Sequence, residues 1–337
     1  MEYNSTTTSR LNNLILNQVY EYGRQFVYFS EGIVIIIANI LTLIVVIRTK
    51  KLRDVPANTF IMSLACADGM IGVLLPAIIL TLLTYDQNIW IVSACIFRGP
   101  YYAMFSISLS TLLAIAIDRY VAVVHPLIYK MQMTVTIARF TCIGIWLLQL
   151  ALWETLTCYY GLQISVQNDR PAAAHDIFPG ISFFFLSQVE ILLPVIGNLI
   201  LYLAIYIKLR RRAAVSVSST SNQNSSNANQ PSAKTKSFTK MMALVLGYLL
   251  LAWLPYYIII PLYKVNNPAT PIWYVYMYDV VSIVLYSNSF VNPVIYSWQN
   301  RDFREAYAKI LKVKTRVRSS ADRTTNNRTI VVTSSNM

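Results

Sequence analysis

Seven long apolar stretches constrain the fold of this chain more than any other feature. They cover residues 26–47, 58–83, 96–117, 136–157, 178–207, 240–263 and 272–298. A transmembrane helix needs about 20 predominantly apolar residues, and each stretch supplies them. Only 13% of the residues are charged, compared with about 25% in soluble domains. Strand-like alternation is absent and an open sheet cannot cross a bilayer. We therefore predict an all-α membrane protein, with a seven-transmembrane helix bundle over residues 26–299.

The positive charges lie on one side of the predicted bundle. Of the 28 Lys and Arg residues, 23 fall in segments 48–56, 119–139, 208–240 and 301–328. By the positive-inside rule these segments are cytoplasmic, so the N-terminus is extracellular. We interpret the net charge of +13 as a consequence of membrane topology, with attraction to anionic membrane lipid, and not as a sign of nucleic-acid binding.

The extracellular parts carry few signals. Residues 1–25 form a polar tail without the apolar core and cleavage site of a signal peptide, so we expect the first span to act as its own insertion signal. Asn4 opens the one glycosylation sequon on this side. Cys95 starts the third span and Cys158 follows the fourth. Because both lie on the oxidising side, a Cys95–Cys158 disulfide is the pairing that this topology favours.

The cytoplasmic parts include three further segments. Residues 213–237, rich in Ser, Asn, Thr and Gln, are predicted to be a disordered loop. Residues 300–311 alternate charge with apolar residues at helical spacing, which predicts a short amphipathic helix in the membrane interface after the seventh span. Residues 312–337 are basic and rich in Ser and Thr, and we expect a disordered tail.

Charged and helix-breaking residues inside the spans mark candidate functional positions. The triplet Asp118-Arg119-Tyr120 ends the third span, where charge is costly and tends to mark function, although a plain interfacial anchor is the alternative. Asp68 lies in the middle of the second span, so its carboxyl group must be protonated, paired or bound to a cation. Pro255 and Pro293 remove backbone hydrogen bonds within spans, and such sites kink helices.

Together these features resemble the rhodopsin-like (class A) G-protein-coupled receptors, over about residues 26–311. The resemblance rests on motifs that fall in order on the spans, namely Asn39, Asp68, Asp118-Arg119-Tyr120, Trp146, Pro194, Tyr202, Trp253-Leu254-Pro255 and Asn292-Pro293-Val294-Ile295-Tyr296. The segment from Ser287 to Tyr296 looks most like that of the amine and adenosine-type receptors.

The resemblance implies two polar sites. The first is an activation switch in which Arg119 leaves Asp118 for the G protein, made of Asp118, Arg119, Tyr120, Tyr202, Trp253, Pro255, Asn292, Pro293 and Tyr296. The second is a sodium pocket made of Asp68, Ser108, Asn288, Ser289 and Asn292. Sodium would act there as an allosteric ligand, and a water-filled hydrogen-bond network is the alternative.

A ligand pocket is expected in the outer half of the bundle. Its candidate residues are Tyr101, Phe105, Glu190, Tyr256, Tyr257 and Tyr286. Glu190 is either the counter-ion of a cationic ligand, with help from cation–π contacts, or a protonated residue hydrogen-bonded between helices. The seventh span has no lysine for retinal, and the outer half of the third span has no acid of the kind that amine receptors carry.

The resemblance predicts a plasma-membrane receptor that couples an extracellular small ligand, cationic or aromatic, to heterotrimeric G proteins by outward movement of the sixth span. Receptor kinases and arrestin are candidate partners of the Ser/Thr-rich tail. The chain has no constellation for catalysis and is not expected to be an enzyme. The foot of the sixth span reads Lys234-Thr235-Lys236, without an acid to restrain Arg119, so raised basal activity is expected. A ligand-independent receptor and, less favoured, a seven-helix transporter or channel are the alternatives.

Overall fold

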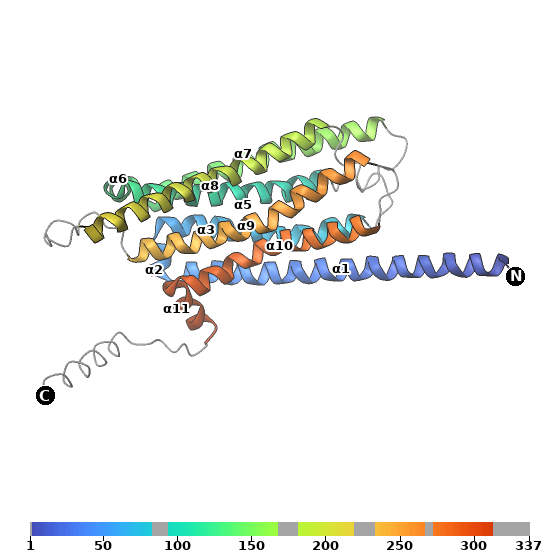
Figure 1. Cartoon of the computed structure of the whole chain (residues 1–337), viewed down its shortest axis with the longest axis horizontal. Helices are drawn as coiled ribbons and strands as arrows, with labels where there is room; N and C mark the ends of the chain where they lie inside the picture. Colours follow the sequence, from blue (N-terminus) through green and yellow to red (C-terminus); the bar gives the residue numbers. More distant parts are fainter. Residues whose placement is uncertain (1, 83–93, 168–180, 219–232, 267–271, 313–337) are drawn as a thin grey trace.

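In a computed structural model, long helices run side by side in one bundle (Figure 1). The structure describes residues 2–82, 94–167, 181–218, 233–266 and 272–312, without side-chain detail at several helix ends. The long helices are α1 (Glu2–Arg48), α3 (Pro56–Leu82), α5 (Gly99–Val124), α7 (Val135–Gln167), α8 (Ile181–Ser218), α9 (Ala233–Asn266) and α10 (Ile272–Gln299). The short elements are α2 (Lys50–Arg53), the π-helical turn η1 (Ala94–Arg98), α6 (Pro126–Gln132) and α11 (Arg301–Ile310).

The bundle confirms the prediction of an all-helical membrane protein. Within the described residues, six helices contain stretches that are long and apolar enough to cross a membrane. The remaining long helix, α9, has a shorter apolar stretch at Ala243–Ile259. The side chains of α9 from residue 260 onward are not described, so the apolar run on the outer side of this stretch is not counted.

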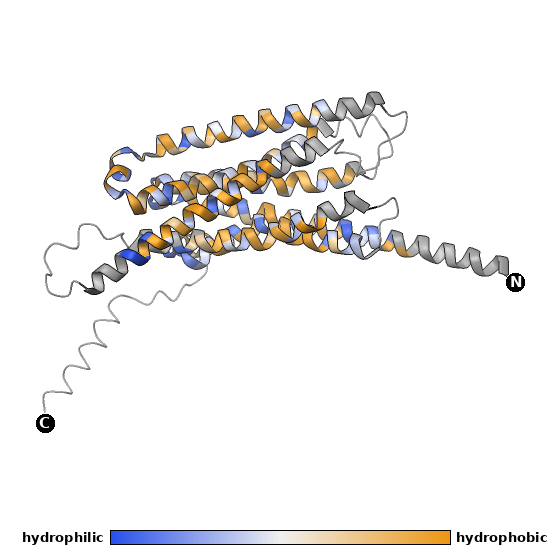
Figure 2. Ribbon diagram, turned by 45° about the horizontal axis from the view of Figure 1, so that its top comes forward, coloured by the Kyte–Doolittle hydropathy of each residue, from blue (hydrophilic) through white to orange (hydrophobic). Residues whose placement is uncertain are grey.

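The core of the bundle is formed by two apolar clusters. One lies toward the end of the bundle that is predicted to be cytoplasmic, and it contains Phe60, Leu64, Ile115, Trp253 and Tyr296 among other residues. The other lies toward the outer end and includes the buried residues Tyr28, Ile71, Tyr101, Ile107 and Trp153. Many large apolar side chains are exposed, and hydrophobic residues occupy much of the length of the long helices (Figure 2). Such an apolar exterior is expected for a bundle whose solvent is lipid.

Three helix ends differ from the sequence-based expectations. Helix α1 begins at Glu2, so the polar tail 1–25 continues the first span as one helix. Helices α8 and α9 extend into the segment 213–237 that was predicted to be disordered, because α8 ends at Ser218 and α9 begins at Ala233. The rest of that loop, 219–232, and the tail 313–337 lie outside the described residues.

Helix α11 occupies the segment for which the interfacial helix was predicted. Asn300 caps it, because its side chain accepts a hydrogen bond from the backbone N–H of Asp302 at 3.0 Å. Its apolar residues Phe303 and Tyr307 are buried against the bundle. The exposed face of the helix carries Arg301 and other charged residues, so the amphipathic pattern decides which side packs.

Candidate functional site

The C-terminal part of α5, which is predicted to face the cytoplasm, places a charged pair inside the bundle. Arg119 Nε donates a hydrogen bond to Asp118 Oδ2 at 2.8 Å, and Arg119 Nη2 contacts the same oxygen. The two side chains are only 8% and 1% exposed, respectively. A buried charge that loses its partner is strongly destabilised, so this pair has a large effect on which conformation the cytoplasmic end adopts.

Tyr129 is a second partner of Arg119, and sequence analysis missed it. Arg119 Nη2 donates to Tyr129 Oη at 2.9 Å, and the guanidinium carbon lies 5.7 Å from the centre of the tyrosine ring. The chain leaves helical geometry at His125 and starts α6 at Pro126, and this turn brings Tyr129 back beneath α5. Burial raises the pKa of Tyr129 to about 12, so its hydroxyl group stays protonated at physiological pH. The only sequence signal was the Pro126 break, which does not reveal where the new helix points.

The other predicted switch residues lie between this end and the middle of the bundle. Trp253 on α9 and Tyr296 on α10 are 4% and 1% exposed. Tyr296 packs against Phe303 of α11, with ring centres 5.8 Å apart. Tyr202 on α8 is half-buried against the same apolar cluster. The remaining members are the half-buried Tyr120 and Pro255 and the buried Asn292 and Pro293.

Asp68 is the centre of a buried polar cluster that joins α3, α5 and α10. Its side chain is fully buried. Ser108 Oγ donates to Asp68 Oδ1 at 3.0 Å, and Asn292 Nδ2 donates to Asp68 Oδ2 at 3.0 Å. Ser289 is buried beside them, and its backbone carbonyl accepts a hydrogen bond from Asn39 of α1 at 2.9 Å.

The donor set of this cluster fits a monovalent hard cation. It supplies one carboxylate and several neutral oxygens, and hard cations prefer oxygen ligands. The side-chain oxygen of Asn288, the residue before Ser289 on α10, is buried and has no hydrogen-bond partner among the described residues, so this acceptor is available to a ligand. No group of three or more His, Cys, Asp or Glu residues lies together in the described chain, so no cluster with the charge of a typical divalent site is present there.

Aromatic side chains from α5, α9 and α10 meet in the outer half of the bundle. Phe105 packs edge-on against Tyr101 at 5.1 Å and against Trp253 at 5.8 Å between ring centres, and it lies 6.1 Å from Tyr286. Tyr256 and Tyr257 lie 6.3 and 5.9 Å from Trp253. The five predicted pocket residues other than Glu190 are thus all aromatic, and each ring packs against another of them or against Trp253.

Glu190 lies on α8 and is half-buried. Ser106 Oγ, which comes from α5, donates a hydrogen bond to Glu190 Oε2 at 2.9 Å. Ser106 is 1% exposed, so its hydroxyl group fixes the carboxyl group between the two helices. Sequence analysis did not find Ser106, because a serine next to Phe105 has no signal until α8 is placed opposite α5.

A second carboxyl group fastens the outer part of α1 to α10. Asp279 accepts a hydrogen bond from Tyr28 Oη at 2.9 Å and another from Tyr20 Oη. Both tyrosines belong to α1, and Asp279 is 8% exposed. Because one carboxylate accepts hydrogen bonds from two tyrosines about two helical turns apart on α1, these contacts fix the rotation of α1 about its own axis.

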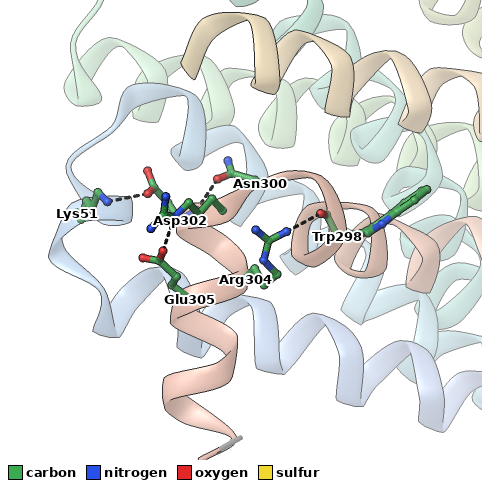
Figure 3. Close-up of polar contacts among 7 residues, drawn as sticks. Lys51, Trp298, Asn300, Asp302, Arg304 and Glu305 are labelled. Atoms are coloured by element: carbon green, nitrogen blue, oxygen red, sulfur yellow. Dashed lines mark hydrogen bonds and ion pairs between the residues drawn. The ribbon is translucent and has the colours of Figure 1, made fainter. Parts of the chain in front are cut away.

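The interfacial helix α11 is held by polar contacts at its start (Figure 3). Lys51 Nζ pairs with Asp302 Oδ1 at 2.6 Å, which raises the pKa of Lys51 above its ordinary value. Arg301 pairs with Glu305 on the same helix at 2.6 Å. Arg304 Nη1 donates to the backbone carbonyl of Trp298 at 3.2 Å. These contacts link α11 to α2 and to the end of α10.

Several sequence predictions fall on side chains outside the described set. They include Asn4, Cys95 and the span-six residues Lys234 and Lys236. Cys158 is half-buried near the outer part of α7. The glycosylation site, the disulfide and the effect of the missing acid therefore stay predictions.

Comparison with known proteins adds an independent result. The family described as "7 transmembrane receptor (rhodopsin family)" matches residues 38–296. The chain is 25% identical to trace amine-associated receptor 7c of Rattus norvegicus, over 90% of this chain and 87% of that protein. It is 28% identical to adenosine receptor A2a of Homo sapiens, over 85% of this chain and 71% of that protein. It is also 24% identical to somatostatin receptor type 4 of Rattus norvegicus, with 85% and 72% covered.

Proposed function

The chain belongs to the rhodopsin family of seven-transmembrane receptors, and we propose that the ligand of this G-protein-coupled receptor is a small aromatic amine. Membership makes the chain a multi-pass membrane protein that signals through G proteins, in a family of receptors rather than enzymes. We further propose the plasma membrane as its location, with the N-terminus outside, because the basic residues gather on the opposite side.

The hydrogen bond from Ser106 to Glu190 is the observation that carries the proposed ligand class. It holds a half-buried carboxyl group between α5 and α8, bonded to the residue that follows the predicted pocket residue Phe105. A carboxylate in such a place needs a cationic partner or a proton. A protonated amine satisfies the first requirement, and its charge can also lie over aromatic ring faces.

The aromatic cluster explains why the amine is expected to carry a ring. Phe105 and Tyr286 offer ring faces and edges from two helices, and apolar pockets of this kind bind ligands mainly through buried area. The names of the trace amine-associated and adenosine receptors refer to small ligands, which supports a small ligand for this receptor as well. Amine receptors of the family place their acid on the third span, whereas Glu190 would serve from the fifth.

Signal transfer is proposed to run through Trp253 to the cytoplasmic end. A ligand on Phe105 and Tyr257 would touch the rings that pack directly on Trp253. The ligand would increase the population of the α9 conformation to which it binds more tightly. The ratio of its affinities for the two conformations sets the size of this population change. In that conformation α9 moves outward, and Arg119 leaves Asp118 and contacts the G protein beside Tyr202 and Tyr296.

Sodium is proposed to oppose this shift. Asp68 would hold the ion with oxygens of Ser108, Asn288, Ser289 and Asn292. The bound charge would favour the resting arrangement of α3, α5 and α10, the helices that carry these residues. The buried acceptor of Asn288 supports this proposal.

Signalling without ligand is a second candidate function. The foot of the sixth span, Lys234-Thr235-Lys236, has no acid to hold Arg119. The restraint from Tyr129 offsets part of that loss. We therefore propose a receptor with basal activity that an amine increases further.

The test is a G-protein dissociation assay in cells that express the intact chain or the variant Glu190→Gln. A panel of aromatic amines is compared with neutral analogues in which a hydroxyl group replaces the amine. Loss of a partly buried charge pair costs about 2–5 kcal/mol, so the variant should respond to an active amine at concentrations at least about 30-fold higher.

Glu154→Gln is the matched control, because Glu154 is also a half-buried acid of the outer half but lies on α7. It should leave the amine response unchanged. Equal potency of amines and neutral analogues on the intact chain, or an unchanged response in Glu190→Gln, would contradict the amine proposal and leave the family assignment intact.

A further inference from the structure

Glu31 is a buried acid that has no role in the mechanism described so far. It lies on α1, in the outer half of the first predicted span, and it is only 8% exposed. Both of its carboxylate oxygens are buried and accept no hydrogen bond from any described residue. An ionisable group at such a place is stable only with a proton or a cationic partner.

No cation in the described part of the chain balances the charge of Glu31. It makes no ion pair there, and no described Lys or Arg lies close enough to act on its carboxyl group. The nearest basic residue along α1, Arg24, is already paired with Glu21. The carboxyl group of Glu31 is therefore available to a cation that enters the bundle.

Close packing of α1 holds Glu31 inside the bundle. A methyl group added to Gly32, the next residue, would lie 2.8 Å from the backbone oxygen of Gly72 on α3, so the two backbones nearly touch there. One turn before Glu31, Tyr28 donates a hydrogen bond to Asp279 of α10 at 2.9 Å. Because α1 is held by both neighbouring helices, turning Glu31 out toward lipid would break these contacts.

Tyr286 connects Glu31 with the predicted ligand pocket. It comes from α10 and lies close enough to Glu31 to interact with the carboxyl charge. Tyr28 packs edge-on against Tyr286, with ring centres 5.7 Å apart. Tyr286 also lies 6.4 Å from Tyr101 and 6.1 Å from Phe105. Glu31 thus borders the same aromatic cluster as the predicted pocket residues.

The aromatic cluster lies between Glu31 and the other acid of the pocket, Glu190. Helix α1 packs against α3 and α10, whereas α8, which carries Glu190, packs against α5 and α9. Figure 1 shows α1 at one edge of the bundle, with α9 and α10 drawn between it and α8. Glu190 bonds to Ser106, the neighbour of Phe105. A molecule that contacts both acids is therefore elongated and passes along the rings of Phe105 and Tyr286.

We propose that Glu31, together with the rings of Tyr28 and Tyr286, is a second cation subsite of the ligand pocket. The ligand that fits both acids is a diamine with an aromatic centre. One ammonium group pairs with Glu190 and the other pairs with Glu31, where ring faces also attract it. This inference rests on the proposed function for the first amine and adds the second.

Thermal unfolding of the purified full-length receptor measures binding without requiring G-protein activation, because a ligand of the folded state raises the unfolding temperature. The probes are compounds with a central phenyl ring and two aminoalkyl arms, in a series of arm lengths. Each is compared with the amino alcohol in which a hydroxyl group replaces one amine. At the best arm length, the diamine should give the same rise in temperature at a concentration at least about 30-fold lower, because it makes a second buried charge pair.

The variant Glu31→Gln should abolish this advantage of the diamine and leave binding of the amino alcohol nearly unchanged. Without ligand it should not lower the unfolding temperature, because it removes a buried acid that has no partner in the described bundle. Glu31→Met, with an apolar group of similar size, should give the same result and serves if Glu31→Gln does not fold. Glu21→Gln is the matched control, because Glu21 is an acid of the same helix that already has a cation, Arg24. It should retain the advantage of the diamine.

Two results would overturn the second subsite. One is equal binding of diamine and amino alcohol to the native chain at every arm length. The other is an advantage of the diamine that survives in both Glu31→Gln and Glu31→Met, which would make Glu31 a protonated structural residue. Failure of the proposed function gives a different result: a diamine advantage that depends on Glu31 but not on Glu190 would retain the Glu31 subsite and refute the role of Glu190.

Discussion

Removing the hydroxyl group of Tyr129 tests the structural account of the resting receptor. Tyr129→Phe deletes the 2.9 Å hydrogen bond from Arg119 and retains the aromatic ring 5.7 Å from the guanidinium group. A hydrogen bond to a charged group contributes about 1.5–3 kcal/mol. Because Tyr129 is half-buried and water replaces part of the loss, the lower value applies. It shifts the equilibrium toward the active conformation by about tenfold.

The assay is basal G-protein dissociation without ligand, at matched surface levels of the native and variant receptors. Basal signal should rise in Tyr129→Phe. Tyr206→Phe is the control, because Tyr206 is 59% exposed on the outside of α8, and it should behave like the native chain. Basal activity of Tyr129→Phe equal to that of the native receptor would refute the role of this contact.

The pH dependence of the same contact follows from the pKa of Tyr129. Burial raises this pKa to about 12, above the ordinary value near 10. The hydroxyl group therefore keeps its proton, and the contact is fully present, at every pH below about 10; it is lost only as the pH rises through the folded value. The ratio of variant to native signal should be the same at the two ends of the physiological pH range.

Three further predictions concern the sodium cluster and the interfacial helix. Replacing external sodium by a bulky organic cation should raise basal signalling of the native receptor, and Asp68→Asn should abolish this dependence; an equal sodium response in both would contradict the pocket. Phe303→Ala should cost about 3–5 kcal/mol and lower the thermal unfolding temperature of the purified receptor, because Phe303 is fully buried; an unchanged temperature would show that α11 is not part of the folded core. Lys51→Ala should shift the same temperature far less, because its ion pair with Asp302 is exposed and worth about 0–1 kcal/mol; a shift as large as that of Phe303→Ala would contradict this ranking.

The helical framework was predictable because lipid imposes a simple rule on sequence. Each span must be long and apolar, so the stretches can be read from hydropathy. The orientation that the charges indicate stays a prediction. The Asp118–Arg119 pair could also be predicted, because neighbours in sequence remain neighbours in space. The tail 1–25 was harder, since its polar composition hides the helix that continues from the span.

Contacts between helices were not predictable from one sequence. The bond from Ser106 to Glu190 depends on how far α5 and α8 are rotated and shifted, and hydropathy separates only lipid-facing from interior positions. The contact between Tyr129 and Arg119 depends on the direction that α6 takes after Pro126. The link from Tyr20 to Asp279 spans most of the chain, and nothing local to either residue indicates it.

The most direct test of the receptor mechanism compares the intact chain with Arg119→Ala at matched surface levels, using a panel of G-protein dissociation reporters. The account predicts a basal signal above that of cells without receptor, an increase with an aromatic amine, and loss of both in Arg119→Ala. A chain that activates no G protein with or without any amine of the panel, or a variant that signals as well as the native receptor, would contradict it.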